Sequence, residues 1–114
     1  MVPRFSLVIP AYNEERLLPR LLDSVDIARS AYGDRDAIEV IVADNVSTDR
    51  TAELAAARDC RVARVEKRVI AASRNGGARI AAGEIICFID ADFRIHPQTF
   101  VEIDKAFASG DCVG

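Results

Sequence analysis

Apolar residues along the 114-residue chain gather in four short runs, separated by longer segments in which apolar positions recur every three or four residues. Runs of four to eight apolar residues are typical of buried strands, and the longer period is typical of helices with one apolar face. The runs predict four strands, at Phe5–Ile9, Ile38–Ala43, Arg61–Val65 and Ile85–Ile89.

The segments between these runs carry helix signals. Leu17 to Ala28 have helical spacing, with Pro19 near the first turn and Gly33 as the stop. Three further helices are predicted over Asp49–Arg58, Ser73–Ala82 and Pro97–Ala108, the last closed by Gly110. Ser47 or Thr48 is available as the N-cap of the first of these three.

Strand and helix therefore alternate four times, and the strands look apolar on both faces. This pattern predicts an α/β fold with a mainly parallel, doubly wound, Rossmann-like sheet and helices on both faces. The length predicts one small domain over 1–114. The closing residues 111–114 look like the start of another strand, so we expect this domain to be a fragment.

Composition narrows the class of protein. Half of the residues are hydrophobic, 29% are charged and the net charge is −3. These values fit a globular domain and do not fit a basic nucleic-acid binder. No apolar run approaches the ~20 residues of a membrane helix, and no signal peptide is seen. Three cysteines without C-x-x-C spacing indicate neither a disulfide framework nor a zinc site, so we expect a reducing, cytoplasmic environment.

Polar clusters follow three of the four predicted strands. They are Tyr12–Glu15 after the first, Asp44–Asp49 after the second and Asp90–Asp92 after the fourth. Ligands of open parallel sheets bind beyond the carboxyl ends of the strands, near the point where strand order reverses. If the first and fourth strands are neighbours, the three clusters should converge on one crevice.

Asp90 and Asp92 are the strongest candidates for chemistry. In extended backbone, residues two apart face the same side, roughly 6–7 Å apart, which leaves room for a cation and a ligand hydroxyl. Mg²⁺ or Mn²⁺ typically takes one or two carboxylates and completes its shell with water and phosphate oxygens. The plain alternative is a polar turn that contains two aspartates.

Asp44 and Arg74 are further candidates. Asp44 lies at a strand tip, too far upstream to cap the next helix, where a carboxylate can accept a hydrogen bond from a base N–H. Arg74 lies in the first turn of the predicted Ser73–Ala82 helix, where the macrodipole disfavours a cation unless a phosphate binds there. The adjacent Asn75-Gly76-Gly77 would let backbone approach such a ligand closely. The alternatives are ordinary capping chemistry and a solvated arginine.

Several enzyme classes lack their signatures here. The chain has no G-x-G-x-x-G after its first strand, no G-x-x-x-x-G-K-[ST] and no G-x-S-x-G. It also lacks the glycine-rich first loop and downstream lysine of a nucleotidyltransferase. A nucleotide-binding or regulatory module without transfer activity stays open as the alternative to an enzyme.

Four stretches carry a resemblance that covers nearly the whole chain: SLVIPAYNEERLLPRLL, VIVADNVSTDRTAELA, ASRNGGARIAAGEIICFIDAD and GDCVG. In order and spacing they resemble the family-2 glycosyltransferases of GT-A fold. The resemblance implies transfer of a sugar from a nucleoside-diphosphate donor, assisted by Mn²⁺ or Mg²⁺. It identifies Asp90-Ala91-Asp92 as the family's D-x-D motif, with Asp92 as the principal metal ligand and Asp90 facing the ribose or the metal.

The resemblance also implies a set of nucleotide-sugar contacts. Asp44 would contact the base, and Arg74 would approach the base or the diphosphate. The full set it implies is Pro10, Tyr12, Glu14, Asp44, Asn45, Arg74, Asp90 and Ala91. The chain departs from the family at three positions: Asn45 replaces a common Asp, Val46 a common Gly and Phe93 a frequent polar residue.

The resemblance leaves the reaction partners open. The donor could carry uridine or guanosine, and the acceptor could be a glycan, a lipid or a small molecule. We expect an inverting transfer whose general base lies beyond Gly114, so that the isolated chain binds the donor and transfers nothing. We also expect an exposed sheet edge that supports a homodimer, in a cytoplasmic protein that could meet the inner face of the membrane through a partner.

Overall fold

Strand β1 (Phe5–Ala11) lies inside a four-stranded parallel sheet, with order β3-β2-β1-β4. Its neighbours are β2 (Ile38–Asp44) and β4 (Ile85–Phe88), and β3 (Arg61–Arg64) forms the far edge beyond β2. The computed structural model describes residues 2–66 and 70–109, without the side chains of 70–74, 108 and 109. The predicted parallel α/β fold is confirmed.

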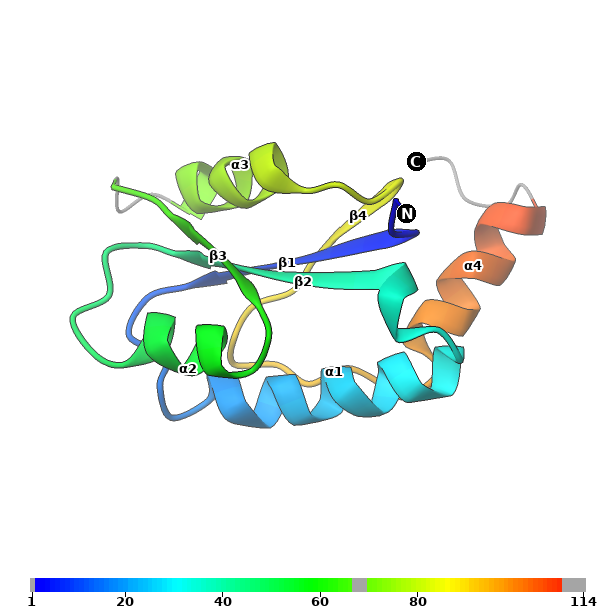
Figure 1. The fold of residues 1–114 in the computed structure, drawn as a ribbon, viewed down its shortest axis with the longest axis horizontal. Helices are drawn as coiled ribbons and strands as arrows, with labels where there is room; N and C mark the ends of the chain where they lie inside the picture. Colours follow the sequence, from blue (N-terminus) through cyan, green and yellow to red (C-terminus); the bar gives the residue numbers. More distant parts are fainter. Residues whose placement is uncertain (1, 67–69, 110–114) are drawn as a thin grey trace.

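Helices cover both faces of this sheet (Figure 1). Helices α1 (Leu18–Tyr32) and α2 (Thr51–Ala57) lie on one face, and α3 (Ile70–Ile80) lies on the other. Helix α4 (Thr99–Ser109) packs against α1, and a short 3-10 helix, η1 (Arg35–Ala37), leads into β2. None of the helices in the described part of the chain has the length and apolar character needed to cross a bilayer.

The core is split by the sheet into two unequal layers. The larger layer packs β1 and β2 against α1 and α4, and the smaller one packs the opposite strand face against α3. Phe5 and Phe100 anchor the larger layer, with ring centroids 5.2 Å apart. The smaller layer is built around four buried residues, Val8, Ile41, Ala43 and Ala63.

Strand β4 differs from β1 and β2, because only one of its faces is buried. Ile85 and Cys87 pack on the large core, whereas Ile86 and Phe88 are 42% and 46% exposed on the other face. The expectation that this strand is buried on both faces is therefore wrong. The physical reason is its place at the edge of the sheet, where α3, which packs on β1, β2 and β3, leaves that face open.

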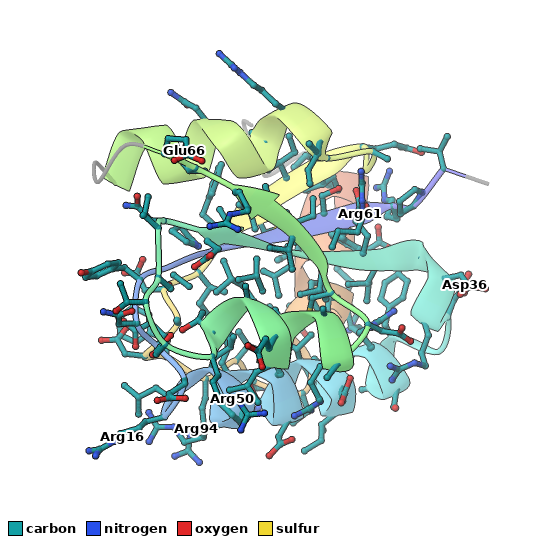
Figure 2. The ribbon with its side chains drawn as sticks, turned by 60° about the vertical axis from the view of Figure 1, so that its left-hand side comes forward. Arg16, Asp36, Arg50, Arg61, Glu66 and Arg94 are labelled. Atoms are coloured by element: carbon teal, nitrogen blue, oxygen red, sulfur yellow. The ribbon has the colours of Figure 1, made fainter. Side chains whose placement is uncertain are left out.

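The start of β4 is nevertheless firmly held by a group of hydrogen bonds around the Glu39 carboxylate on β2. Glu39 accepts hydrogen bonds from Ser6 Oγ at 2.5 Å, from the Ala82 N–H at 2.5 Å and from Arg61 at 2.8 Å. Arg61 is the first residue of β3 (Figure 2). The Gly83 N–H donates to Ser6 Oγ at 2.7 Å. A Cβ on Gly83 would lie 2.7 Å from backbone atoms of β1, so only glycine fits this approach.

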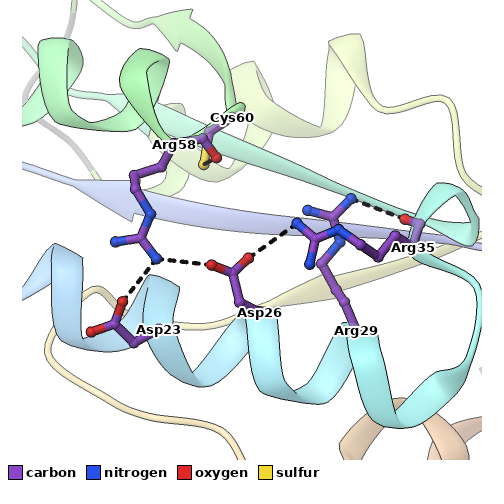
Figure 3. Close-up of polar contacts among 6 residues, drawn as sticks. All are labelled: Asp23, Asp26, Arg29, Arg35, Arg58 and Cys60. Carbon is purple, nitrogen blue, oxygen red and sulfur yellow. Dashed lines mark hydrogen bonds and ion pairs between the residues drawn. The ribbon is translucent and has the colours of Figure 1, made fainter.

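A second polar network ties α2 to α1 and η1 (Figure 3). Arg58 donates to Asp23 at 2.8 Å and to Asp26 at 2.9 Å, and Arg35 donates to Asp26 at 3.3 Å. Burial alone would raise the pKa of Asp26, but the hydrogen bonds from Arg58 and Arg35 outweigh it and lower the pKa. This network fixes the end of α2, away from the carboxyl ends of the strands.

Candidate functional site

A cavity of about 240 Å³ opens at the carboxyl ends of the strands. It lies where strand order reverses, because β2 and β4 flank β1 on opposite sides. Its lining comes from the ends of β1, β2 and β4 and the loops that follow them. The lining residues are Pro10, Ala11, Tyr12, Glu14, Asn45, Asp90, Ala91 and Asp92. The predicted convergence of three polar strand ends is therefore confirmed.

The loops after β1 and β2 are joined by hydrogen bonds on one side of this cavity. The Asn45 N–H donates to the Ala11 carbonyl at 2.8 Å, and the Asn13 N–H donates to Ser47 Oγ at 3.0 Å. The Thr48 N–H donates to Asn13 Oδ1 at 2.8 Å. The predicted N-cap role of Ser47 or Thr48 is thus wrong, because both residues bind the neighbouring loop.

Asp49 makes the side-chain hydrogen bonds at the start of α2. Its Oδ1 accepts from the Thr51 N–H at 2.9 Å, and its Oδ2 accepts from the Glu15 N–H at 3.3 Å. Thr51 Oγ1 in turn accepts from the Glu14 N–H at 2.9 Å. We named Asp49 and Glu14 from the sequence but did not predict these hydrogen bonds, although the density of Ser, Thr and Asp after β2 was a usable signal.

Asp44 and Asn45 end β2 and are both more than nine-tenths buried, with exposed fractions of 2% and 8%. Asn45 lines the cavity, and Asp44, the residue directly before it, is the last residue of β2. One side-chain oxygen of each, Oδ1 in both cases, has no hydrogen-bond partner among the described residues. Buried acceptors without partners are rare and costly, so two adjacent ones suggest a site completed by a donor from a ligand.

Asp90 and Asp92 lie in a turn, because β4 ends at Phe88. The Phe93 N–H donates to the Asp90 carbonyl at 3.1 Å, which closes the turn. The predicted extended geometry for the two carboxylates is therefore wrong, although both line the cavity. Arg20 on α1 donates to the Asp92 carbonyl at 3.0 Å, and this hydrogen bond connects the turn to α1.

The cavity is electrostatically negative. Burial raises the pKa of Glu14, and the nearby carboxylates of Asp92, Asp49 and Asp90 raise it further. Among the described residues, no Lys or Arg side chain lines the cavity. Arg16 and Arg94 do not line the cavity, and Figure 2 shows their side chains pointing away from the sheet.

These side chains fit a divalent cation that is shared with a ligand. Within the described residues, no group of three or more His, Cys, Asp or Glu side chains is arranged to hold a metal by itself. Mg²⁺ and Mn²⁺ often bind through one or two carboxylates, with water and substrate phosphates as the other ligands. Asp92 and Asp90 could supply those carboxylates. Burial first, and then the charges of Asp92, Asp49 and Asp90, raise the pKa of Glu14, and a cation would offset those charges.

The expected ligand contacts of Arg74 and of the two nearby glycines find no support in the described structure. The side chain of Arg74 lies outside the described residues, and α3 begins at Ile70, so Arg74 follows the first turn instead of lying in it. Gly77 contacts Val8 on β1, and a Cβ on Gly76 would lie 2.6 Å from Val65 Cγ2. These two glycines let α3 pack closely on the sheet, so the expected approach of backbone to a ligand is not needed to explain them.

Val46, which stands where the family commonly has glycine, adopts a backbone conformation that is typical of glycine. Its φ is +55°, in the left-handed region that glycine adopts at little cost. The loop therefore turns as a glycine would allow, with a β-branched residue in an unfavourable conformation. Phe93 is 55% exposed at the outer end of the D-x-D turn.

Known proteins resemble this chain over almost its full length. Validoxylamine A glucosyltransferase of Streptomyces hygroscopicus subsp. limoneus is 36% identical over 114 residues, covering 94% of this chain and 24% of the relative. The chain thus spans about a quarter of the length of that relative.

Solved structures agree with this. Residues 1–349 of S. aureus TarS superpose with a TM-score of 0.83 at 26% identity, over 93% of this chain and 32% of that fragment. TarS has also been solved with UDP-GlcNAc. The mannosyltransferase PcManGT from Pyrobaculum calidifontis, in complex with GDP-Man and Mn²⁺, gives 0.78 at 31% identity, over 95% of this chain and 33% of that one. The family model described as "Glycosyl transferase family 2" matches residues 6–113, and the chain belongs to this family.

Proposed function

We propose that residues 1–114 form the donor-binding half of a glycosyltransferase that moves a sugar from a UDP- or GDP-linked donor to an acceptor. The observation that carries this proposal is the acidic cavity at the switch point, where the ends of β1, β2 and β4 meet. Relatives crystallised with UDP-GlcNAc and with GDP-Man support a nucleotide-sugar ligand.

The cavity divides into two ends with different tasks. The base would lie at the β2 end, where the orphan oxygens of Asp44 and Asn45 can accept hydrogen bonds from its N–H groups. Pro10, Tyr12 and Glu14 would line the nucleotide between the two ends. Neither orphan oxygen has another partner in the described chain, which supports a ligand donor at this position.

The diphosphate would lie at the β4 end, beside Asp90, Ala91 and Asp92. Asp92 would be the main protein ligand of a divalent cation, and Asp90 would face the ribose or the same cation. When bound, the cation would stabilise the negative charge that develops on the leaving diphosphate. Two relatives crystallised with Mn²⁺ support this choice of metal. Arg20, through the Asp92 carbonyl, would keep the turn in place.

None of the acids in the cavity lining is assigned to the acceptor. Glu14, Asp90 and Asp92 are the acids of the cavity lining, and the proposal assigns all three to the donor. An inverting transfer needs a further general base to activate the acceptor hydroxyl. We place that base outside residues 1–114, so this chain by itself should bind donor and transfer no sugar. The acceptor could be a glycan, a lipid or a small molecule.

Binding of UDP and GDP by calorimetry, with and without Mn²⁺, tests the proposal. The wild-type protein should bind one of them, and Mn²⁺ should strengthen this binding. Asp92→Asn should remove the gain from Mn²⁺ and leave the fold unchanged by circular dichroism. Asp36→Asn, an exposed carboxylate in η1, is the matched control and should bind as wild type does. An Asp92→Asn protein with unaltered metal-dependent binding would refute the metal assignment.

The exposed face of β4 supports a second, smaller proposal. Strand β4 is at the edge of the sheet in the described part of the chain, Ile86 and Phe88 are partly exposed on it, and edge strands favour pairing with another chain. Two copies of this chain would pair through β4.

A further inference from the structure

Two residues beside the cavity hold their backbone in the left-handed region. They are Asn13, with a φ of +51°, and Val46, with a φ of +55°. Asn tolerates this conformation because its short side chain can hydrogen-bond locally. For a β-branched residue the same conformation is a true outlier, which persists only when the surrounding structure enforces it.

Hydrogen bonds to the end of β1 and to the loop that follows it flank Val46 on both sides. Before it, the Asn45 N–H donates to the Ala11 carbonyl at 2.8 Å. After it, Ser47 Oγ accepts from the Asn13 N–H at 3.0 Å, and the Thr48 N–H donates to Asn13 Oδ1 at 2.8 Å. Thr48 Oγ1 also donates to Asn13 Oδ1, at 3.4 Å. Asn13 therefore makes the contacts on the far side of Val46, one through its backbone and two through its side chain.

Val46 directly follows Asn45, so a rotation at Val46 changes the backbone next to the Asn45 side chain. Asn45 is 8% exposed and lines the cavity, and its buried Oδ1 has no partner in the described chain. If the contacts of Asn13 were lost, Val46 would be free to return to a negative φ. That rotation would redirect the adjoining backbone and move the Asn45 amide away from the cavity.

We propose that Asn13 is a positioning residue, which holds Val46 in its left-handed turn and thereby keeps the Asn45 amide aimed at the bound nucleotide. The inference rests on the proposed function, since it takes the cavity to be the nucleotide site. It assigns Asn13 a role that needs no contact with the ligand. The exposed Asn13 side chain acts through the Thr48 N–H.

Two substitutions separate the side-chain contact from the backbone conformation. Asn13→Gly keeps the positive φ accessible and removes the acceptor, whereas Asn13→Asp keeps an acceptor at the same place. Measured with UDP and GDP in saturating Mn²⁺, Asn13→Gly should weaken binding about tenfold, on the scale of one lost hydrogen bond and a displaced contact. Asn13→Asp should stay within about threefold of wild type.

A double-mutant cycle with Val46→Gly tests the route of the effect. Glycine adopts a positive φ readily, so the loop of the Val46→Gly variant should keep its turn without help from Asn13. Adding Asn13→Gly to Val46→Gly should therefore cost about threefold or less in affinity, against about tenfold in the wild-type background. An equal loss in both backgrounds would overturn the proposal, because Asn13 would then not act through the turn.

Asp59→Gly is the matched control. Asp59 is a further non-glycine residue with a positive φ, at +63°, and lies between α2 and β3, away from the cavity lining. Its replacement should leave nucleotide affinity unchanged. If the wild type binds neither UDP nor GDP, the proposed function fails. If the wild type binds and Asn13→Gly binds equally well with an unchanged fold, the role of Asn13 alone is refuted.

Discussion

The two ends of the cavity are built in different ways. At the β2 end, Asp44 and Asn45 are almost fully buried, and the loops after β1 and β2 are hydrogen-bonded to each other at several points. At the β4 end, Asp90 and Asp92 are exposed on a turn that follows a half-covered edge strand. This turn is held by the Phe93–Asp90 hydrogen bond, by Arg20, and by Ala91, which is buried in the large core.

This difference suggests how binding would proceed. Groups that are already held in place need little ordering when a ligand arrives, so the β2 end should recognise its part of the ligand without help. Exposed carboxylates repel one another, and a cation shared with a diphosphate would order them. We therefore expect base recognition to be independent of metal and diphosphate binding to depend on it.

The largest effects on ligand binding are expected from substitutions of Asp44 and Asp92, which lie at the two ends of the cavity. Asp44→Asn keeps the shape of the buried side chain and removes its charge, so nucleoside and nucleotide binding should both weaken by about 1.5–3 kcal/mol, with or without Mn²⁺. Asp92→Asn should weaken nucleoside-diphosphate binding alone, and only when Mn²⁺ is present. Calorimetry with uridine, guanosine, UDP and GDP measures both. If Asp44→Asn loses nothing for the nucleosides, the base does not lie at the β2 end.

The next effect concerns the anchored start of β4. Gly83→Ala would press a methyl group against backbone atoms of Phe5 and Ser6 at 2.7 Å, and overpacking of this kind costs about 1–3 kcal/mol. We expect a lower free energy of unfolding in urea. Gly33→Ala is the control, because its Cβ would meet nothing within 4 Å and only its φ of +95° is unfavourable. A larger loss for Gly33→Ala would contradict the close-approach explanation.

Glu39 should make the stability of the same region depend on pH. Burial alone would raise its pKa, but hydrogen bonds from Ser6, Ala82 and Arg61 outweigh this and hold the pKa below its ordinary value of 4.5. A lowered folded-state pKa contributes stability above the unfolded value and loses it as pH falls through the folded value. Glu39→Gln should therefore lower the free energy of unfolding by about 0.5–1.5 kcal/mol at pH 7.

The difference between Glu39→Gln and the wild type should begin to shrink below about pH 4.5, where the carboxylate of the unfolded chain is protonated, and should be lost once the pH falls below the lower pKa of the folded protein. Urea unfolding of both proteins from about pH 3 to about pH 7 measures this. A difference that is constant over the whole range would show that the charge of Glu39 does not contribute.

The smallest effect on stability is expected at the open face of β4. Ile86 is 42% exposed, and Ile86→Thr keeps a β-branched residue in the strand, so the free energy of unfolding should change by less than about 1 kcal/mol. Its effect on self-association should be larger, if two copies pair through this edge. Sedimentation equilibrium should show weaker association than for the wild type. A monomeric wild type, or an unchanged variant, would refute pairing through β4.

Much of the molecule could be predicted from sequence because the relevant signals are local. The alternation of apolar runs and helical periods determined the order of elements, since each element buries its own apolar residues. Pro19 and Gly33 set the ends of α1 as expected, with Gly33 at a φ of +95°. Polar residues directly after strands predicted the place of the cavity, because parallel strands bring their carboxyl ends to one edge.

Tertiary structure decided the features that depend on which segments become neighbours. Ser47 and Thr48 could have capped α2, but β1 places Asn13 beside them, and a hydrogen-bonding group serves the partner that packing brings. Gly76 and Gly77 look like a ligand loop in sequence, and the packing of α3 on the sheet accounts for them. The exposure of Ile86 and the strained turn at Val46 also depend on contacts between distant segments, which no local pattern of residues records.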